Sequence, residues 1–201
     1  MRRFSMGSIL AVLTAMMILA YPISARADVI DSHSHWSGSL SITGSDIVDD
    51  TGDGTGSKAS VSDLTERGTL GIAAVRVVSE ISTNPTGYYT ANCQAPYFVE
   101  FGFVAHSSVT RYASTGDLLS TLMDSGYLCL DPYSGGFVFS VDVNIVGGTG
   151  QFAGATGTAN ATGGGQFLLT SANGRAAFAS LDGHTVAHIV TPGRAVSRRG
   201  L

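Results

Sequence analysis

Apolar and polar side chains alternate along several segments of this chain. The clearest case is 137–145, where five apolar side chains share the odd positions: Phe137, Phe139, Val141, Val143 and Ile145. The even positions between them include Asp142 and Asn144. A repeat of two residues is the period of a β-strand, because successive side chains point to opposite faces. The pattern predicts a half-buried strand whose odd positions face the core.

The same alternation predicts further strands with weaker contrast. It is present at 71–81 and 97–106, and strands are also expected at 35–43, 118–130, 156–169 and 175–190. The last of these is expected to be interrupted at Asp182-Gly183. No comparable segment has the 3.6-residue period of a helix. The chain therefore predicts about eight strands joined by tight turns.

Composition supports the same class of fold. Glycine accounts for 26 of the 201 residues and charged residues for only 13%, which disfavours long helices. Many antiparallel strands in one domain hide their edges by closing or stacking. We expect an all-β protein, a single antiparallel β-barrel of about eight strands at 28–190. A flexible, acidic, Gly-rich loop is expected at 44–63 and a loose tail at 191–201.

Residues 1–27 have the parts of a signal peptide. Arg2 and Arg3 precede the apolar run 9–21, and Ala25-Arg26-Ala27 offers a small-residue cleavage site. The run is shorter than the roughly 20 residues that span a membrane. We expect cleavage before Asp28, a secreted or periplasmic protein, and no membrane contact afterwards. A formal net charge of −4 also argues against nucleic acid as a partner.

Cys93 and Cys129 are the two cysteines of the chain. An even number of cysteines in an oxidising compartment favours a disulfide, so we expect these two to be bonded. The alternative is a pair of buried free thiols. A thioredoxin-like redox role is disfavoured, because the sequence has no Cys-x-x-Cys.

A glycine-rich segment, 147–157, follows the strand at 137–145. Gly148-x-Gly150-x-x-Ala153 matches the dinucleotide-binding fingerprint, but that motif requires a helix next and an acidic residue about 20 positions on. A poor helix sequence follows, and no acidic residue lies between Asp142 and Asp182. We therefore expect no nucleotide and no other cofactor.

The alternative is a connection between strands, with Phe152 buried as a plug. Five glycines would then serve the backbone by allowing positive φ and close approach. They are Gly147, Gly148, Gly150, Gly154 and Gly157.

The motif Gly-Gly-Thr-Gly-x-Phe-x-Gly-Ala-x-Gly, after an alternating strand, resembles the signature of the allene oxide cyclase/dirigent barrel group. It is especially similar to secreted bacterial members of unknown function, although Gln151 stands where they often have Arg. Segment 114–119 also resembles their strand entry, so the resemblance covers about 114–165. It implies an eight-stranded antiparallel barrel with an apolar interior. It carries no catalytic residue over to this chain.

Three polar residues are weak candidates for acid–base chemistry. Glu100 and His106 occupy even positions of 97–106, which form the less apolar set, and Asp142 occupies an even position of 137–145. They would serve as acid and base groups if those faces lined a cavity. Alternation normally places polar residues in solvent, which is the interpretation we favour.

Asp31, His33 and His35 are weak candidates for a metal site. On a strand, residues two apart share a face at roughly 6.6 Å spacing, and His-x-His beside an acid is a three-ligand set. The segment lies close to the expected mature N-terminus, so we expect no ordered metal there.

Two functional hypotheses follow. The favoured one is a non-catalytic secreted barrel that binds a small apolar ligand or acts as a surface module. The other, implied by the family resemblance, is an isomerase or cyclase of the allene-oxide-cyclase type, or a dirigent-like guide for radical coupling. The barrel interior separates them. A cavity above roughly 300 Å³ with buried ionisable groups would support chemistry, and a filled interior would exclude it.

Overall fold

A computed structural model describes residues 27–47, 56–171 and 176–193. Nine strands make up most of this part of the chain. They are β1 (Asp28–Ile47), β2 (Ser57–Gly68), β3 (Gly71–Ser82), β4 (Gly87–Tyr88), β5 (Val99–Tyr112), β6 (Leu118–Leu130), β7 (Gly136–Gly148), β8 (Thr156–Thr170) and β9 (Ala176–Thr191). The same part of the chain holds no helix long and apolar enough to cross a membrane.

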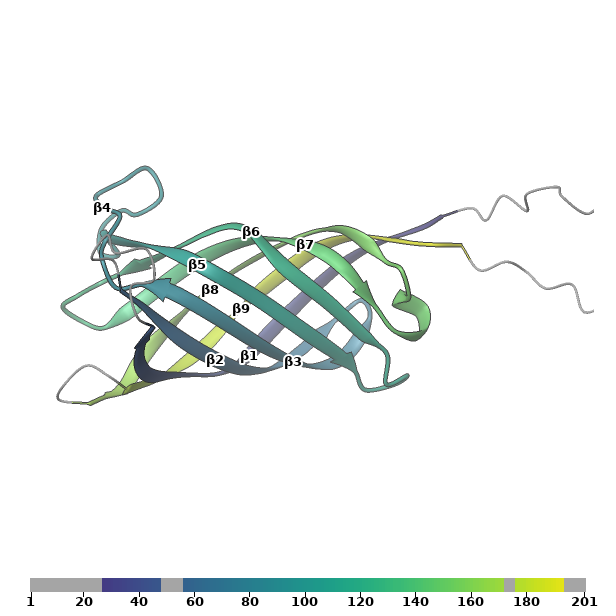
Figure 1. Ribbon diagram of the computed structural model, residues 1–201, viewed down its shortest axis with the longest axis horizontal. Coiled ribbons are helices and arrows are strands. Elements are labelled where there is room, and N and C mark those ends of the chain that lie inside the picture. Colours follow the sequence, from purple (N-terminus) through teal and green to yellow (C-terminus); the bar gives the residue numbers. More distant parts are fainter. Residues whose placement is uncertain (1–26, 48–55, 172–175, 194–201) are drawn as a thin grey trace, which may run out of the picture.

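Eight of the strands form a closed antiparallel barrel (Figure 1). The order is β3-β2-β1-β9-β8-β7-β6-β5, and pairing of β3 with β5 closes the ring. The short β4 pairs with β5 outside this ring. Closure gives each of the eight strands two hydrogen-bonded neighbours, which removes the free edges of the sheet. The predicted all-β barrel of about eight strands is therefore confirmed.

The terminal strands complete the barrel. β9 pairs with β1 over its whole length, from Asp28↔Thr191 to Thr43↔Ala176. Every other pair of neighbouring barrel strands is consecutive in the chain, except β3 and β5, which are separated by the short β4. The barrel is thus an up-and-down meander that the two ends close.

The number of barrel strands agrees with the prediction, but two expectations about individual segments were wrong. The two ends of the loop expected at 44–63 are strand, since β1 runs on to Ile47 and β2 begins at Ser57, while 48–55 lie outside the described residues. The last strand has no break at Asp182-Gly183. The segment 57–63 looks like a loop because its buried positions are serines, Ser60 and Ser62, rather than large apolar residues.

Some expectations concern residues outside the described ranges. The signal peptide at 1–27 lies almost wholly outside them, as does most of the tail at 191–201. Within that tail, Thr191 is the last residue of β9.

The apolar face of β7 points into the barrel, as predicted. Phe137, Val141, Val143 and Ile145 are buried, and the half-buried Phe139 packs against the same core. Asp142 and Asn144 are exposed on the outer wall. Strict alternation therefore identified the inner face of this strand correctly.

A short connection closes one end of the barrel. The 3₁₀ turn η1 (Gly150–Phe152) leads from β7 to β8, and the Phe152 side chain is fully buried. It packs on Tyr112, with ring centroids 5.0 Å apart. The backbone at Gly150 has φ +57, and a Cβ there would lie 1.8 Å from the Asp117 carboxylate. Glycine is therefore required at the turn that returns Phe152 to the core.

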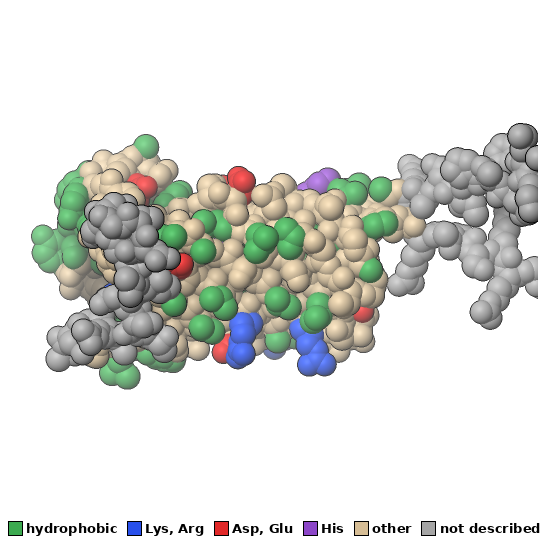
Figure 2. Space-filling view, viewed as in Figure 1, with side chains coloured by type: hydrophobic (Ala, Val, Ile, Leu, Met, Phe, Trp, Pro, Cys, Tyr) green, Lys and Arg blue, Asp and Glu red, His purple; other side chains and the backbone are tan. Residues whose placement is uncertain are grey.

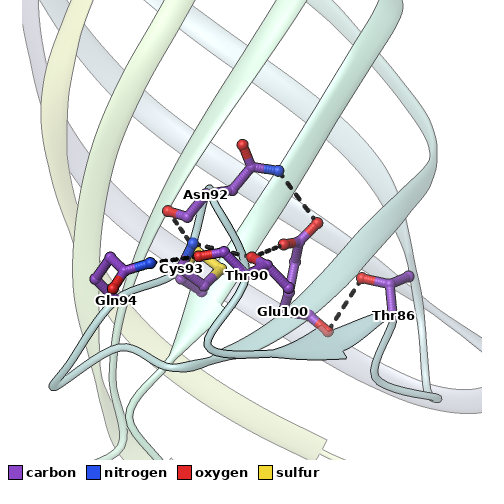
Figure 3. Close-up of a disulfide and its surroundings, with 7 residues drawn as sticks. Thr86, Thr90, Asn92, Cys93, Gln94 and Glu100 are labelled. Atoms are coloured by element: carbon purple, nitrogen blue, oxygen red, sulfur yellow. Dashed lines mark hydrogen bonds between the residues drawn. A yellow bond between two sulfur atoms is a disulfide. The ribbon is translucent and has the colours of Figure 1, made fainter.

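A disulfide holds the other end, confirming the predicted pair. Cys93 and Cys129 are bonded and both are fully buried (Figure 3). The Thr90 hydroxyl bonds the Glu100 carboxylate and accepts from the Cys93 N–H. These contacts tie the loop between β4 and β5 to the barrel wall.

Candidate functional site in the barrel interior

The interior of the barrel holds a cavity of about 130 Å³. Its walls are mostly apolar and come from all eight barrel strands. Trp36, Phe103 and Phe139 supply aromatic surface, and Trp36 stacks on Phe139 with ring centroids 5.8 Å apart. An eight-stranded barrel has an interior just wide enough for its side chains or for one small ligand. Here the side chains leave space for a ligand.

The cavity meets neither of the two conditions that would separate a binding protein from an enzyme. It is smaller than the roughly 300 Å³ of ordinary ligand pockets, yet the interior is not filled. A cavity of about 150 Å³ in another protein binds benzene. This interior therefore suits a molecule with a single ring.

Hydroxyl groups give the cavity a polar stripe. Buried serines and threonines line it beside the apolar residues: Ser32, Ser34, Ser60, Ser62, Ser79, Thr110 and Thr121. The indole N–H of Trp36 donates to Thr185 Oγ1 at 3.1 Å, and the hydroxyls of Ser108 and Thr121 lie 2.7 Å apart. Such groups orient a ligand within an apolar pocket.

His106 lies on the cavity wall, contrary to the solvent-facing position favoured from the sequence. Its Nδ1 is 2.9 Å from Ser79 Oγ, and its ring meets Phe103 edge-on. Burial lowers the pKa of His106 from 6.5 to about 4. The imidazole is therefore neutral at pH 7 and is both a donor and an acceptor.

A β-bulge explains why the alternation along the sequence predicted the wrong face of the strand for His106. In the pairing of β3 with β5, Glu80 faces Ala105 while Ile81 faces Phe103, so Val104 is the extra residue. One extra residue exchanges the two faces of a strand beyond it. Phe103 and His106 consequently both line the cavity, although one has an odd and the other an even position.

Glu66 and Tyr112 form a second polar group, at the end that Phe152 closes. Glu66 on β2 and Tyr112 on β5 both pair with Ala73 of the intervening β3. Burial raises the pKa of Glu66, and a hydrogen bond from Ser34 partly offsets this. Burial and the Glu66 charge raise the pKa of Tyr112, so its phenol stays protonated.

Glu66 was not among the site residues predicted from the sequence, although the hairpin that contains it indicates which face it takes. Residues that pair in an antiparallel hairpin share a face. The odd positions Ala73, Val75 and Val77 face inward, and the turn at 68–71 sets Glu66 opposite Ala73. Counting back across that turn assigns Glu66 to the interior.

The other acid–base candidates lie elsewhere. Glu100 bonds Thr90 beside the disulfide and does not line the cavity (Figure 3). Asp142 is exposed on the outer wall, where it accepts hydrogen bonds from Ser125 and Asn160. The structure therefore does not bring Glu100, His106 and Asp142 together.

The candidate metal ligands are on the outer wall. Asp31, His33 and His35 are exposed on β1, and Asp31 pairs with His188 of β9 at 2.8 Å. Asp31 and His33 share an open surface groove with Asp142 and His188. Among the described residues, no three His, Cys, Asp or Glu side chains are grouped so that they could hold a metal ion.

The outer wall is chemically mixed. On the face shown in Figure 2, Lys and Arg side chains are few, and hydrophobic side chains gather at the end that carries β4. Tyr88, Tyr89 and Tyr133 are among the exposed aromatic residues of the described chain. The interior, by contrast, is lined mostly by apolar side chains, which makes it the stronger candidate site.

No family model and no curated protein matches the chain. Among solved structures, it is similar to a pterocarpan synthase dirigent protein. The match has 12% sequence identity and a TM-score of 0.41, and it covers 86% of this chain and 90% of that chain.

Proposed function

We propose that this protein binds a small, single-ring molecule inside its barrel. The observation that carries the proposal is the cavity of about 130 Å³, with apolar and aromatic walls and a stripe of hydroxyl groups. A volume of this order accepts a single aromatic ring. Binding rather than catalysis is the better supported role.

The separation of the ionisable groups argues against a paired acid–base mechanism. His106 is in register with Ser79 and Ser60, whereas Glu66 lies six residues further along β2. Six residues of strand span roughly 20 Å. The two groups therefore lie toward opposite ends of the cavity and would not act on the same atom of a one-ring ligand.

The protein is also proposed to act outside the reducing cytosol. The Cys93–Cys129 bond supports this, because disulfides persist in oxidising compartments. The signal-peptide pattern at 1–27 supports the same proposal.

Titration with benzyl alcohol tests the binding proposal. Trp36 is the one tryptophan of the chain and lines the cavity, so its emission reports on occupancy. We expect saturable one-to-one binding, with a Kd of roughly 1 µM to 1 mM for a ligand of this size. Calorimetry gives the stoichiometry independently.

Two phenylalanine substitutions on β3 provide the matched control. Val77→Phe places a ring in the cavity, and Val78→Phe places the same ring on the outer wall, where Val78 is 48% exposed. Benzyl alcohol should bind wild type and Val78→Phe but not Val77→Phe. Absence of saturable binding to wild type, or equal binding to both variants, contradicts the proposal.

A further inference from the structure

Glu66 is an acid in a cavity whose wall holds no lysine or arginine to neutralise it. Among the residues that line the cavity, none is Lys or Arg. The ionisable members are Glu66, His106 and Tyr112. A carboxylate taken out of water without a counter-charge is costly, and a bound positive group would lower that cost.

The basic residues nearest in sequence face away. Arg67 follows Glu66 on β2, Arg111 precedes Tyr112 on β5, and both are exposed on the outer wall. Alternation along a strand requires this, because adjacent side chains point to opposite faces. His106 lies toward the other end of the cavity and is neutral at pH 7.

The partners that Glu66 does have are neutral. The Ser34 hydroxyl donates a hydrogen bond to its carboxylate. Trp36 is its cross-strand neighbour on β1, and Tyr112 lies beyond Ala73 on the other side. One hydroxyl donor leaves most of the acceptor sites of a carboxylate free for a ligand.

We propose that the ligand is a small amine, bound as its ammonium ion with the nitrogen at Glu66 and its apolar part along the cavity. This inference rests on the proposed function, because it identifies the chemical class of the molecule in the same cavity. A one-ring amine fits the available volume of about 130 Å³. The ammonium supplies the charge that the cavity wall lacks, and the Glu66 carboxylate pairs with it.

Benzylamine and benzyl alcohol test the inference, because they have nearly the same shape and differ in charge. At pH 7.5 the amine is protonated. Binding to wild type is measured by calorimetry and by Trp36 emission. We expect benzylamine to bind at least tenfold more tightly than benzyl alcohol, since charge-assisted hydrogen bonds are about twice as strong as neutral ones.

Glu66→Gln removes the charge and keeps the shape of the side chain. It should reduce benzylamine affinity at least tenfold and leave benzyl alcohol within about threefold of wild type. Retained benzyl alcohol binding also shows that the variant is folded. Asp63→Asn is the matched control, because Asp63 lies on the same strand but is exposed on the outer wall beside Arg76. It should keep the wild-type preference.

The outcomes distinguish the two proposals. If neither molecule binds wild type, the proposed function fails and the amine inference fails with it. If benzyl alcohol binds as tightly as benzylamine, or if Glu66→Gln keeps the preference for the amine, the barrel still binds ligands and the amine inference alone is overturned.

Discussion

His106 shows at the residue scale how burial sets the chemistry of the cavity. Its imidazole is half-buried against Phe103 and bonds Ser79. Burial disfavours the charged form, and no carboxylate lies beside it to compensate. The group is thus kept neutral where a small ligand would meet it.

Stability should fall in acid because of this histidine. The unfolded chain takes up the proton near pH 6.5 and the folded protein only near pH 4. His106 therefore contributes fully above pH 6.5, and the contribution is lost as the pH falls toward 4. One pKa unit corresponds to about 1.4 kcal/mol, so a shift from 6.5 to about 4 sets an upper bound of roughly 3.5 kcal/mol on the loss.

Urea unfolding at pH 7.0 and 4.5 measures this loss. His106→Asn should show a smaller drop in the free energy of unfolding between the two pH values than wild type does. His33→Asn, on the outer wall, should keep the wild-type drop. Equal drops in wild type and His106→Asn would exclude His106 as the source.

At the scale of elements, the connection from β7 to β8 depends on one anchor. Phe152 is fully buried among Tyr112, Leu119, Ile145 and Ile189. The glycines around it let the chain turn back: Gly147, Gly150, Gly154 and Gly157 all have positive φ. Gly148 has no such φ, but a Cβ there would lie 2.0 Å from the Leu118 carbonyl oxygen.

Phe152→Ala should therefore destabilise the protein by about 3–5 kcal/mol, since it removes a buried ring and leaves a cavity. The neighbouring change Gln151→Ala should stay within about 0.5 kcal/mol, because that side chain is exposed and its backbone N–H keeps its bond to Asp117. Chemical denaturation measures both. A loss below 1 kcal/mol for Phe152→Ala would show that the plug does not hold this end of the barrel.

At the scale of the whole molecule, the barrel gives up stability to keep its cavity. Ser62 is 6% exposed on the cavity wall, where a larger apolar side chain would fill space and bury more surface. Binding sites commonly carry such a cost in stability. The serines of β1 and β2 keep the interior open at that cost.

Ser62→Val should raise the free energy of unfolding by about 1 kcal/mol, through added apolar burial, and weaken benzyl alcohol binding. Thr65→Val makes a comparable change on the exposed face of β2 and should alter neither property. Thermal unfolding and calorimetry are the measurements. A more stable Ser62→Val variant with unchanged affinity would place the ligand elsewhere.

Local alternation was sufficient to predict the class of fold and the inner face of β7. The contrast between Phe137–Ile145 and the intervening Asp142 and Asn144 is strong, and no bulge interrupts it before Ile145 in the pairing with β8. The glycine motif around Phe152 was predicted to connect strands for a similarly local reason, because the sequence that follows it is a poor helix and lacks the acidic residue that a dinucleotide site needs. Because the chain has two cysteines, a single intramolecular disulfide was possible.

The candidate site depended on contacts between strands that are distant in sequence. A single extra residue at Val104 turned His106 inward, and the hairpin register placed Glu66 opposite Ala73. Both effects are settled by pairing with a neighbouring strand, which the alternation within one strand does not record. The strand β2 was missed because its inward positions are serines, and a serine is recognised as interior only when the barrel closes around it. Alternation along the chain was thus enough to predict the strands with large apolar side chains and the side that each apolar face takes, whereas closure of the barrel settled which polar residues share the cavity.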